Sequence, residues 1–262
     1  MPSYPSSNTH RALGYRTLHY DIVTSTNDVA KEIAGNSPEA NLVIIAKTQT
    51  YGRGRLGRQW VSPIGGIWLS ILLRPETTLK ETGKLTIIAA SAVARAIQHT
   101  LGLQAEVKWP NDILLDGRKV CGILAETSTK GDASGYAIIG IGINANMDLD
   151  SFPTTFKDSA TTLKHELGRE TDSERLVAAL LDNFVQRYNR LRKGEWDALR
   201  LEWKSLAKFL GKQVEVASFT EVIVGEALDI EEDCALLIRQ ENGLLKRIVA
   251  GDVKLRMAPT GG

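Results

Sequence analysis

The chain has 262 residues with 43% hydrophobic and 24% charged side chains, the composition of an ordinary globular protein. This length allows one sizeable core and a small second domain. Lys and Arg number 32 against 31 Asp and Glu. This balance excludes a protein that binds polyanions over its whole surface, so any anion site must be local.

Cysteines, histidines and apolar runs exclude further classes. Cys121 and Cys234 each lie in an apolar run, which predicts small buried side chains in a reducing compartment. The four histidines are scattered without the spacing of metal ligands, so we expect no structural metal site. No apolar run is long enough to span a bilayer, and residues 1–16 lack the apolar core of a signal peptide. We therefore expect a cytoplasmic protein that does not bind membranes.

The first hundred residues predict a loose start followed by helices and buried strands. Residues 1–16 are polar with two prolines and are predicted to form a flexible leader. Residues 24–35 begin with several N-cap residues and end on glycine, which predicts a short helix. The apolar runs 42–46 and 67–75 are typical of buried strands, and the second is ended by its proline. Residues 80–101 repeat apolar side chains at helical spacing and precede a glycine, so they predict a long helix.

The rest of the chain predicts a hairpin, one more strand, a helical region and a small β unit. Asp116 and Gly117 lie between two apolar runs, which is a hairpin signal. Residues 136–144 are predicted to form a buried strand and residues 173–207 a helical region. From Gly211 onward, short alternating segments indicate about 50 residues of β structure in the form of a small barrel.

These elements indicate an α+β fold with a mixed sheet, because strands and helices do not alternate strictly. The expected parts are a flexible leader over residues 1–16, a main domain over residues 17–210 and a β domain over residues 211–262. No internal repeat or low-complexity linker separates them.

The stretch TYGRGRLGRQW, from Thr50 to Trp60, concentrates three arginines and three glycines without an acid. Glycines let backbone N–H groups approach an anion closely, and arginines supply paired donors to phosphate. The stretch lacks the Gly-Lys-Ser/Thr ending of a Walker loop. Trp60 suits stacking on a nucleotide base, which favours a site for an anionic ligand. A solvated surface loop is the alternative.

A second group of polar residues surrounds the predicted hairpin. KWPND (Lys108 to Asp112) combines a cation, an aromatic ring, a proline and two polar acceptors. Lys119 follows seven residues later, across the turn, so a hairpin folds it back toward Asp112. A lysine held near an aspartate and an arginine loop can clamp a phosphate or a carboxylate. The alternatives are a plain strand end and an edge cation.

GIGIN (Gly140 to Asn144) ends a predicted buried strand with two glycines and an amide. One interpretation is that a ligand lies against the bare backbone and that Asn144 recognises the edge of a base. The alternative is close packing of the glycines against a helix.

Taken in order, these motifs resemble the catalytic core of biotin–protein ligases. The matching stretches are STN (25–27), Q-x-x-GRGR-x-GR-x-W (49–60), KWPND (108–112), K-x-x-GIL-x-E (119–126) and GIGIN (140–144). The resemblance covers residues 18–145 motif by motif. It extends to a small C-terminal SH3-like β-barrel, which such ligases also carry. Leu56 departs from relatives that have a third arginine inside GRGRRGR, which leaves the role of that position open.

The resemblance implies a two-step, ATP-dependent reaction. Biotin and MgATP give biotinyl-5′-AMP and pyrophosphate, and a lysine of a biotin carboxyl carrier protein then accepts biotin. The family's catalytic positions match Lys119, Arg53 and Asp112, the last as a base or as a ligand of Mg²⁺. Its biotin-binding positions match Ser25, Thr26, Asn27, Gln49, Arg53, Gly54, Arg55 and Lys119. Its ATP and adenylate positions match Arg55, Trp60, Asn111, Lys119 and Asn144.

The resemblance also implies partners. The expected acceptor is the carrier domain of acetyl-CoA carboxylase or of a similar carboxylase. Only 24 residues precede Ser25, too few for the winged-helix domain of dual-function relatives, so we expect a monofunctional ligase that does not bind DNA. Whether the chain forms a homodimer stays open. The alternatives are a lipoate–protein ligase-like enzyme and, in another class, a nucleic-acid-binding protein, which the balanced charge disfavours.

Overall fold

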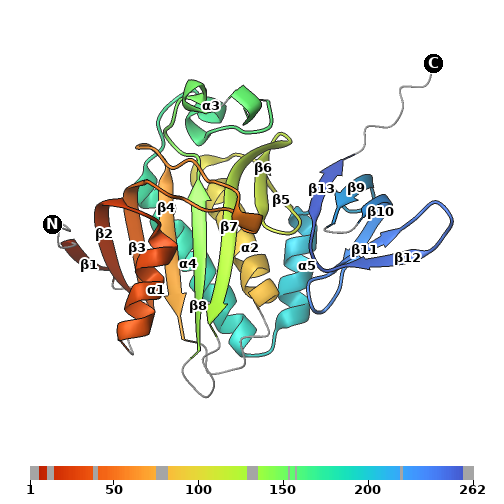
Figure 1. Ribbon diagram of the computed structural model, residues 1–262, viewed down its shortest axis with the longest axis horizontal. Helices are drawn as coiled ribbons and strands as arrows, with labels where there is room; N and C mark the ends of the chain where they lie inside the picture. The colour runs from red at the N-terminus through yellow and green to blue at the C-terminus, as the bar shows by residue number, and fades with distance from the viewer. Residues whose placement is uncertain are drawn as a thin grey trace.

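The computed structural model describes residues 6–10, 15–37, 41–74, 82–128, 135–152, 154–156, 158–218 and 221–255. The larger part is an eight-stranded sheet with the order β1-β2-β3-β4-β8-β7-β6-β5 (Figure 1). Its strands are β1 (Ser6–His10), β2 (Tyr15–Val23), β3 (Leu42–Gln49), β4 (Ile67–Leu73), β5 (Ala105–Lys108), β6 (Asp112–Leu115), β7 (Arg118–Ser128) and β8 (Tyr136–Ile143). Among these strands β2 and β3 pair in parallel, and the other neighbours are antiparallel. This mixed sheet confirms the predicted α+β class.

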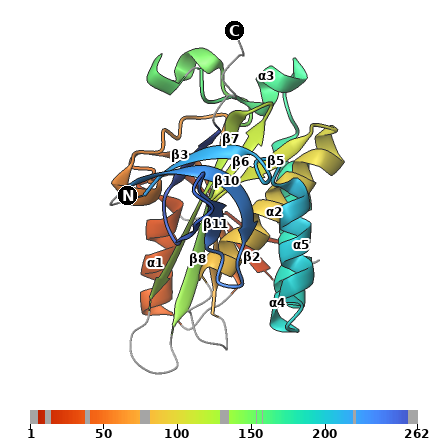
Figure 2. The ribbon, with the colours of Figure 1, turned by 90° about the vertical axis from the view of Figure 1, so that its right-hand side faces the viewer.

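Helices cover the two faces of the sheet, as Figure 2 shows from the side. α1 (Thr26–Asn36) packs on one face, over β3, β4 and β8. α2 (Thr82–Leu101) packs on the opposite face, where α4 (Ser173–Arg192) and α5 (Trp196–Leu206) pack against it. α2 ends before Gly102, whose φ of 73° suits only glycine well. α1 covers only part of this face of the sheet, and the loop between β3 and β4 crosses another part of it (Figure 1).

Short elements connect β8 to α4. They are the 3₁₀ turns Leu149–Ser151 and Thr154–Phe156 and the one-turn helix α3 (Leu163–Leu167). A further 3₁₀ turn, Arg55–Gly57, lies inside the Arg/Gly loop, the stretch from Thr50 to Trp60. No helix in the described residues combines the length and the apolar character needed to cross a membrane.

The C-terminal unit is a five-stranded antiparallel sheet with the order β12-β11-β10-β9-β13. Its strands are β9 (Gln213–Ala217), β10 (Val222–Ile230), β11 (Leu236–Arg239), β12 (Leu245–Ile248) and β13 (Asp252–Leu255). Its apolar core is continuous with that of the large sheet. The indole N–H of Trp109 donates to the carbonyl of Cys234 at 2.9 Å, so the tryptophan of KWPND anchors this unit. Cys121 and Cys234 are both buried, as predicted, and neither forms a disulfide with another described residue.

The structure differs from the sequence-based expectations at three places. Residues 6–10, expected within a flexible leader, form β1 and pair with β2. Backbone pairing orders this stretch, and polar side chains give no signal of it. The strand β2 itself was not predicted from the sequence. The helical region expected over residues 173–207 breaks after Arg192, where Gly194 has a φ of 81°. The last of the short alternating segments expected after Gly211, LKRIVAGDVKLR, contains two strands, β12 and β13.

Candidate active site

A cavity of about 960 Å³ lies beside α1. It is bordered by the first turn of α1, the loop between β3 and β4, strands β6, β7 and β8, and the start of β13. Clefts of this size are typical of small-molecule sites. Every residue that the sequence assigned to catalysis or ligand binding lines it: Ser25, Thr26, Asn27, Gln49, Arg53, Gly54, Arg55, Trp60, Asn111, Asp112, Lys119 and Asn144. The separate motifs therefore meet in one place.

The parallel pairing of β2 and β3 explains why Ser25 and Gln49 meet, because parallel strands end at the same edge of a sheet. Ser25 is the N-cap of α1, and its hydroxyl accepts from the N–H of Asn27 at 3.3 Å. The Gln49 side-chain oxygen accepts from the N–H of Thr26, and its amide donates to Ser62, both at 2.8 Å. In the described part of the chain, the Ser25 hydroxyl proton and the second Gln49 amide proton have no acceptor. Both donors can therefore reach a ligand.

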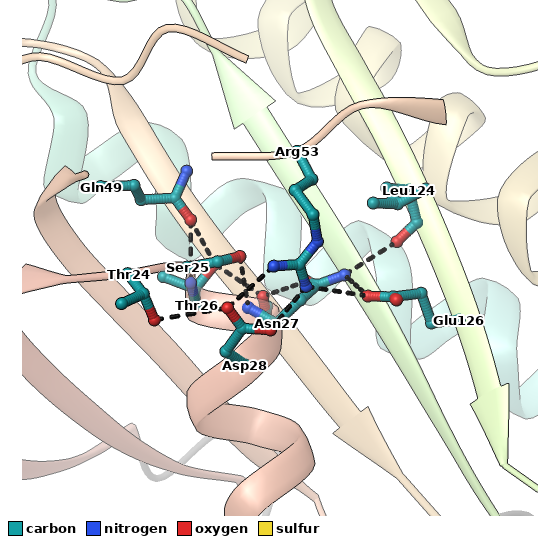
Figure 3. A network of polar contacts seen from close by, with 10 residues as sticks. Thr24, Ser25, Thr26, Asn27, Asp28, Gln49, Arg53, Leu124 and Glu126 are labelled. Carbon is teal, nitrogen blue, oxygen red and sulfur yellow. Dashed lines mark hydrogen bonds and ion pairs between the residues drawn. The ribbon is translucent and has the colours of Figure 1, made fainter. Parts of the chain in front are cut away.

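Asn27 is held by protein partners on both sides of its amide (Figure 3). Its oxygen accepts from Ser70 Oγ, and its nitrogen donates to Glu126, both at 2.6 Å. A Cβ at Gly140 would lie 2.4 Å from the same Asn27 oxygen. The first glycine of GIGIN therefore makes space for a residue of α1, which is the packing alternative considered for this motif.

The indole of Trp60 packs against Gly122 in β7 and Gly142 near the end of β8. A Cβ at Gly142 would lie 2.5 Å from its nitrogen, and one at Gly122 would lie 3.2 Å from its ring. Both glycines permit this close approach. Lys119 Nζ lies 5.1 Å from the ring centroid, which is the geometry of a cation–π contact. Trp60 thus borders the Lys119 end of the cavity.

Asp112 and Lys119 face each other across the predicted hairpin. The turn residues Asp116 and Gly117 have φ angles of 47° and 74°, and a type I′ turn requires positive φ at both positions. Lys119 Nζ lies 2.5 Å from Asp112 Oδ1, and Lys108 Nζ lies 3.4 Å from Oδ2. The predicted approach of Lys119 to Asp112 is confirmed. Two cations share one carboxylate, so a net positive charge remains beside the cavity.

Two arginines of the Arg/Gly loop contact the C-terminal unit. Arg55 donates to Asn111 Oδ1 and to the carbonyl of Gly251, both at 3.3 Å. Burial lowers the pKa of Arg55 from its usual value, so an anion that reaches this guanidinium meets a poorly hydrated charge. Arg58 pairs with Asp252 at the start of β13, with 2.5 Å between Nη1 and Oδ2. The C-terminal unit therefore holds one side of the loop.

The same loop is closed on itself and reaches α1 on its other side. The N–H of Trp60 donates to the carbonyl of Gly52 at 2.9 Å, which closes the base of the loop. Arg53 extends from the loop and forms a bidentate ion pair with Asp28 of α1, at 2.6 and 2.8 Å. The loop is thus connected to both borders of the cavity.

Asn144 directly follows β8 and is buried. Its Nδ2 donates to the carbonyl of Thr161 at 3.1 Å. Its Oδ1 has no donor among the residues that the structure describes. A buried acceptor without a partner is costly unless a ligand or water meets it. Asn144 therefore offers an acceptor to a ligand in the cavity.

Comparison with known proteins identifies the family. The profile of the Biotin/lipoate A/B protein ligase family matches residues 20–144, and that of the Biotin protein ligase C terminal domain matches residues 209–256. The bifunctional ligase/repressor BirA of Bacillus spizizenii is 36% identical over 93% of this chain and 75% of its own length. The biotin–[acetyl-CoA-carboxylase] ligase of Paracoccus denitrificans is 32% identical over 84% of this chain and 92% of its own length. The chain belongs to the biotin protein ligase family.

A solved member of the biotin protein ligase family has the same fold. The biotin protein ligase from Aquifex aeolicus in complex with biotin and ATP is 28% identical to this chain, with a TM-score of 0.79. The match covers 92% of this chain and 99% of that one. It therefore includes the C-terminal unit and confirms the expected biotin ligase fold.

Three residues in or beside the cavity had no role assigned by the sequence analysis. Asp28 pairs with Arg53, and Glu126 accepts from Asn27. Phe156 lines the cavity and is 51% exposed. Asp28 follows the N-cap by three positions, where an acid is common at any helix start, so its local pattern gave no sign of a second partner. Glu126 is the last residue of the motif K-x-x-GIL-x-E, and this position was the available sign in the sequence that it lies near the site.

Proposed function

We propose that this chain is a biotin–protein ligase that forms biotinyl-5′-AMP from biotin and ATP and transfers biotin to a carrier lysine. The observation that carries the proposal is the meeting of the ordered motifs in one cavity, within the fold of this family. The Paracoccus denitrificans relative is named as a ligase of biotin to acetyl-CoA carboxylase, and the Aquifex aeolicus protein holds biotin and ATP. These names support the same substrates and a carboxyl carrier protein as the acceptor.

The first step brings two anions together. A carboxylate oxygen of biotin attacks the α-phosphorus of ATP, and pyrophosphate leaves. Lys119 and Lys108 flank Asp112 at the cavity, so cations stand where this negative charge develops. Contacts with Asp112 and Trp60 fix the Lys119 ammonium group before a substrate arrives. Alignment of carboxylate and phosphate adds about 7–11 kcal/mol of barrier reduction.

The adenine of ATP is proposed to lie beside Asn144. Its amino group is a donor that suits the unpartnered Asn144 Oδ1. Phe156 lines the same cavity and exposes about half of its side chain, so its ring can stack on the base. Trp60 is already packed against Gly122 and Gly142, which leaves Phe156 as the better stacking partner.

The second step transfers biotin to an amine. A carrier lysine attacks the carbonyl carbon of biotinyl-5′-AMP, AMP leaves, and the amine gives up a proton. Asp112 and Asp252 are the carboxylates among the described residues that line the cavity. Asp252 forms an ion pair with Arg58 of the Arg/Gly loop, whereas Asp112 lies beside Lys119, where the reacting groups are proposed to bind. Asp112 is therefore the candidate acceptor of that proton.

Mg²⁺ is proposed to enter with ATP. No group of three or more His, Cys, Asp or Glu in the described residues could hold a metal. Mg²⁺ commonly binds through substrate phosphates and one or two carboxylates, and Asp112 is the residue that would contact it. When bound, the ion supplies neutralisation of the phosphate charge.

Incubation of the chain with labelled biotin, MgATP and a biotin carboxyl carrier domain tests this function. We expect biotin-dependent release of pyrophosphate and ATP-dependent labelling of the carrier. A carrier with its acceptor lysine replaced by arginine is the control and should stay unlabelled. Absence of pyrophosphate release, or transfer of lipoate in preference to biotin, would refute the proposal.

Nucleic acid is a weaker candidate than a small molecule as the ligand of the Arg/Gly loop. Arg53 is paired with Asp28, and Arg58 is paired with Asp252. These carboxylates neutralise the arginine charges that would be needed to bind the phosphate backbone of a nucleic acid. A cavity beside the loop suits a small molecule better.

Asp112→Asn is expected to slow pyrophosphate release by about tenfold or more, which is 1.36 kcal/mol of barrier or more. The asparagine keeps the shape but removes the charge that holds Lys119 and Lys108. Asp116→Asn is the matched control, because Asp116 lies in the exposed turn and asparagine tolerates its positive φ. Transfer from preformed biotinyl-5′-AMP, measured separately, should also slow if Asp112 accepts the amine proton. Wild-type rates in both half-reactions would remove Asp112 from the mechanism.

A further inference from the structure

A group of charged side chains closes the α1 end of the cavity (Figure 3). Arg53 lies between Asp28 on α1 and Glu126 on β7, at 2.6 and 2.8 Å from Asp28 and 4.0 Å from Glu126. Thr24 also donates to the Asp28 carboxylate, at 3.3 Å. Arg53 lines the cavity, whereas neither carboxylate does. Asp28 therefore acts on a ligand through Arg53, and Glu126 acts through Arg53 and Asn27.

The two ends of the cavity carry opposite charge. At one end Arg53 lies near two carboxylates, Asp28 and Glu126. At the other end Lys119 and Lys108 share one carboxylate. Glu126 lies seven residues beyond Lys119 along β7, a separation of roughly 20 Å in a strand. Phosphate is therefore attracted to the lysine end, and an uncharged group suits the Arg53 end.

We propose that Asp28 is a positioning residue for biotin recognition, an inference that rests on the proposed ligase function. Its carboxylate ties Arg53 to the first turn of α1, and this fixes the loop backbone relative to Ser25 and Gln49. The last two residues keep an O–H and an N–H donor for a ligand. The uncharged ureido ring of biotin is the part of the substrates that suits this end.

The same contacts remove Arg53 from phosphate binding. Its guanidinium is already occupied by Asp28 in a bidentate pair, with Glu126 nearby. An anion at this position would have to displace one carboxylate and approach a second. Phosphate binding is thus left to Lys119 and Arg55, and Arg53 keeps only its expected place among the biotin-binding residues.

The Asp28–Arg53 pair acts through geometry more than through stability. Hydrogen bonds from Arg53 lower the pKa of Asp28 and raise that of Arg53, so both stay ionised at neutral pH. Their side chains are 37% and 28% exposed, and solvent screening makes such pairs weak contributors to folding. Two parallel hydrogen bonds nevertheless fix the direction of the guanidinium.

Kinetics of pyrophosphate release by the chain test this role. In Asp28→Ala the KM for biotin should rise about tenfold, while the KM for ATP stays within about twofold. The kcat should change little, because the ground state and the transition state lose the same binding energy. Asp28→Asn keeps the shape and should give a smaller rise, and Asp28→Glu should restore part of the affinity. Arg53→Ala should reproduce Asp28→Ala, and the double variant should be no worse than either. Asp21→Ala removes the exposed pair with Lys47 on the same sheet and should leave both constants unchanged.

An unchanged KM for biotin in Asp28→Ala and Asp28→Asn would overturn the inference, because the loop would then keep its place without the pair. A lower KM for biotin would overturn it too, since Asp28 would then compete with the ligand for Arg53. A rise confined to the KM for ATP in Arg53→Ala would overturn it as well, since Arg53 would then act on the phosphates. Wild-type pyrophosphate release separates these results from failure of the ligase function, which an inactive wild type would show.

Discussion

Lys119→Ala is expected to lower the rate of biotinyl-5′-AMP formation by about 100- to 1,000-fold, the usual effect of removing one preorganised donor. Lys119 Nζ is fixed by Asp112 at 2.5 Å and by the ring of Trp60. Its charge therefore acts mainly when negative charge builds on the carboxylate and the α-phosphate. Biotin binding should stay measurable, because the donors of Ser25 and Gln49 do not depend on this lysine.

Pyrophosphate release and equilibrium binding of labelled biotin measure the two effects separately. Lys47→Ala is the matched control, because Lys47 pairs with Asp21 on the exposed part of the same sheet. A rate for Lys119→Ala within about threefold of wild type, less than one tenfold step of 1.36 kcal/mol, would mean that another cation stabilises the transition state.

Local chemistry accounts for the parts of the fold that the sequence predicts correctly. The pair Asp116 and Gly117 can adopt the positive φ angles of a tight hairpin turn, and both do so. Ser25 caps α1, and Gly102 follows the end of α2. In each case a few adjacent residues decide the conformation, so a sequence pattern is sufficient to find it.

Contacts between distant segments account for what the sequence does not predict. β1 pairs with β2 through its backbone, and no pattern of its polar side chains indicates a strand. The charge of Arg53 is visible in the sequence, but its pairing with Asp28 depends on the loop folding back onto α1. The motif resemblance predicts that Arg53 lies at the ligand site. Only the tertiary structure shows that its guanidinium is already paired with Asp28.

The glycines of GIGIN show the same limit within one motif. The sequence left open whether a ligand or a helix packs against them. Gly140 accommodates Asn27 of α1, and Gly142 accommodates Trp60 of the Arg/Gly loop. Both partners are protein side chains from other motifs. The ordered motifs therefore belong together partly because they pack on one another, and only part of each is left for ligand.

Gly140→Ala is expected to lower the free energy of unfolding by about 2–3 kcal/mol, the cost of leaving buried polar groups without partners. The new Cβ would lie 2.4 Å from Asn27 Oδ1. That oxygen cannot move without losing Ser70 Oγ at 2.6 Å, and rotation of the amide would also break its 2.6 Å bond to Glu126. Asn27 and Ser70 are both buried, so water cannot replace these bonds cheaply.

The midpoint of thermal unfolding should fall on the order of 5–10 °C in Gly140→Ala, and the KM for biotin should rise because the first turn of α1 shifts with Asn27. Gly35→Ala is the matched control: Gly35 lies in α1, and an added Cβ there meets nothing within 4 Å. That variant should be unchanged or more stable by up to about 1 kcal/mol, since alanine favours the helix. If Gly140→Ala unfolds at the wild-type temperature with an unchanged KM for biotin, the Asn27 network has room to rearrange. The glycine of GIGIN would then be required for something other than packing against α1.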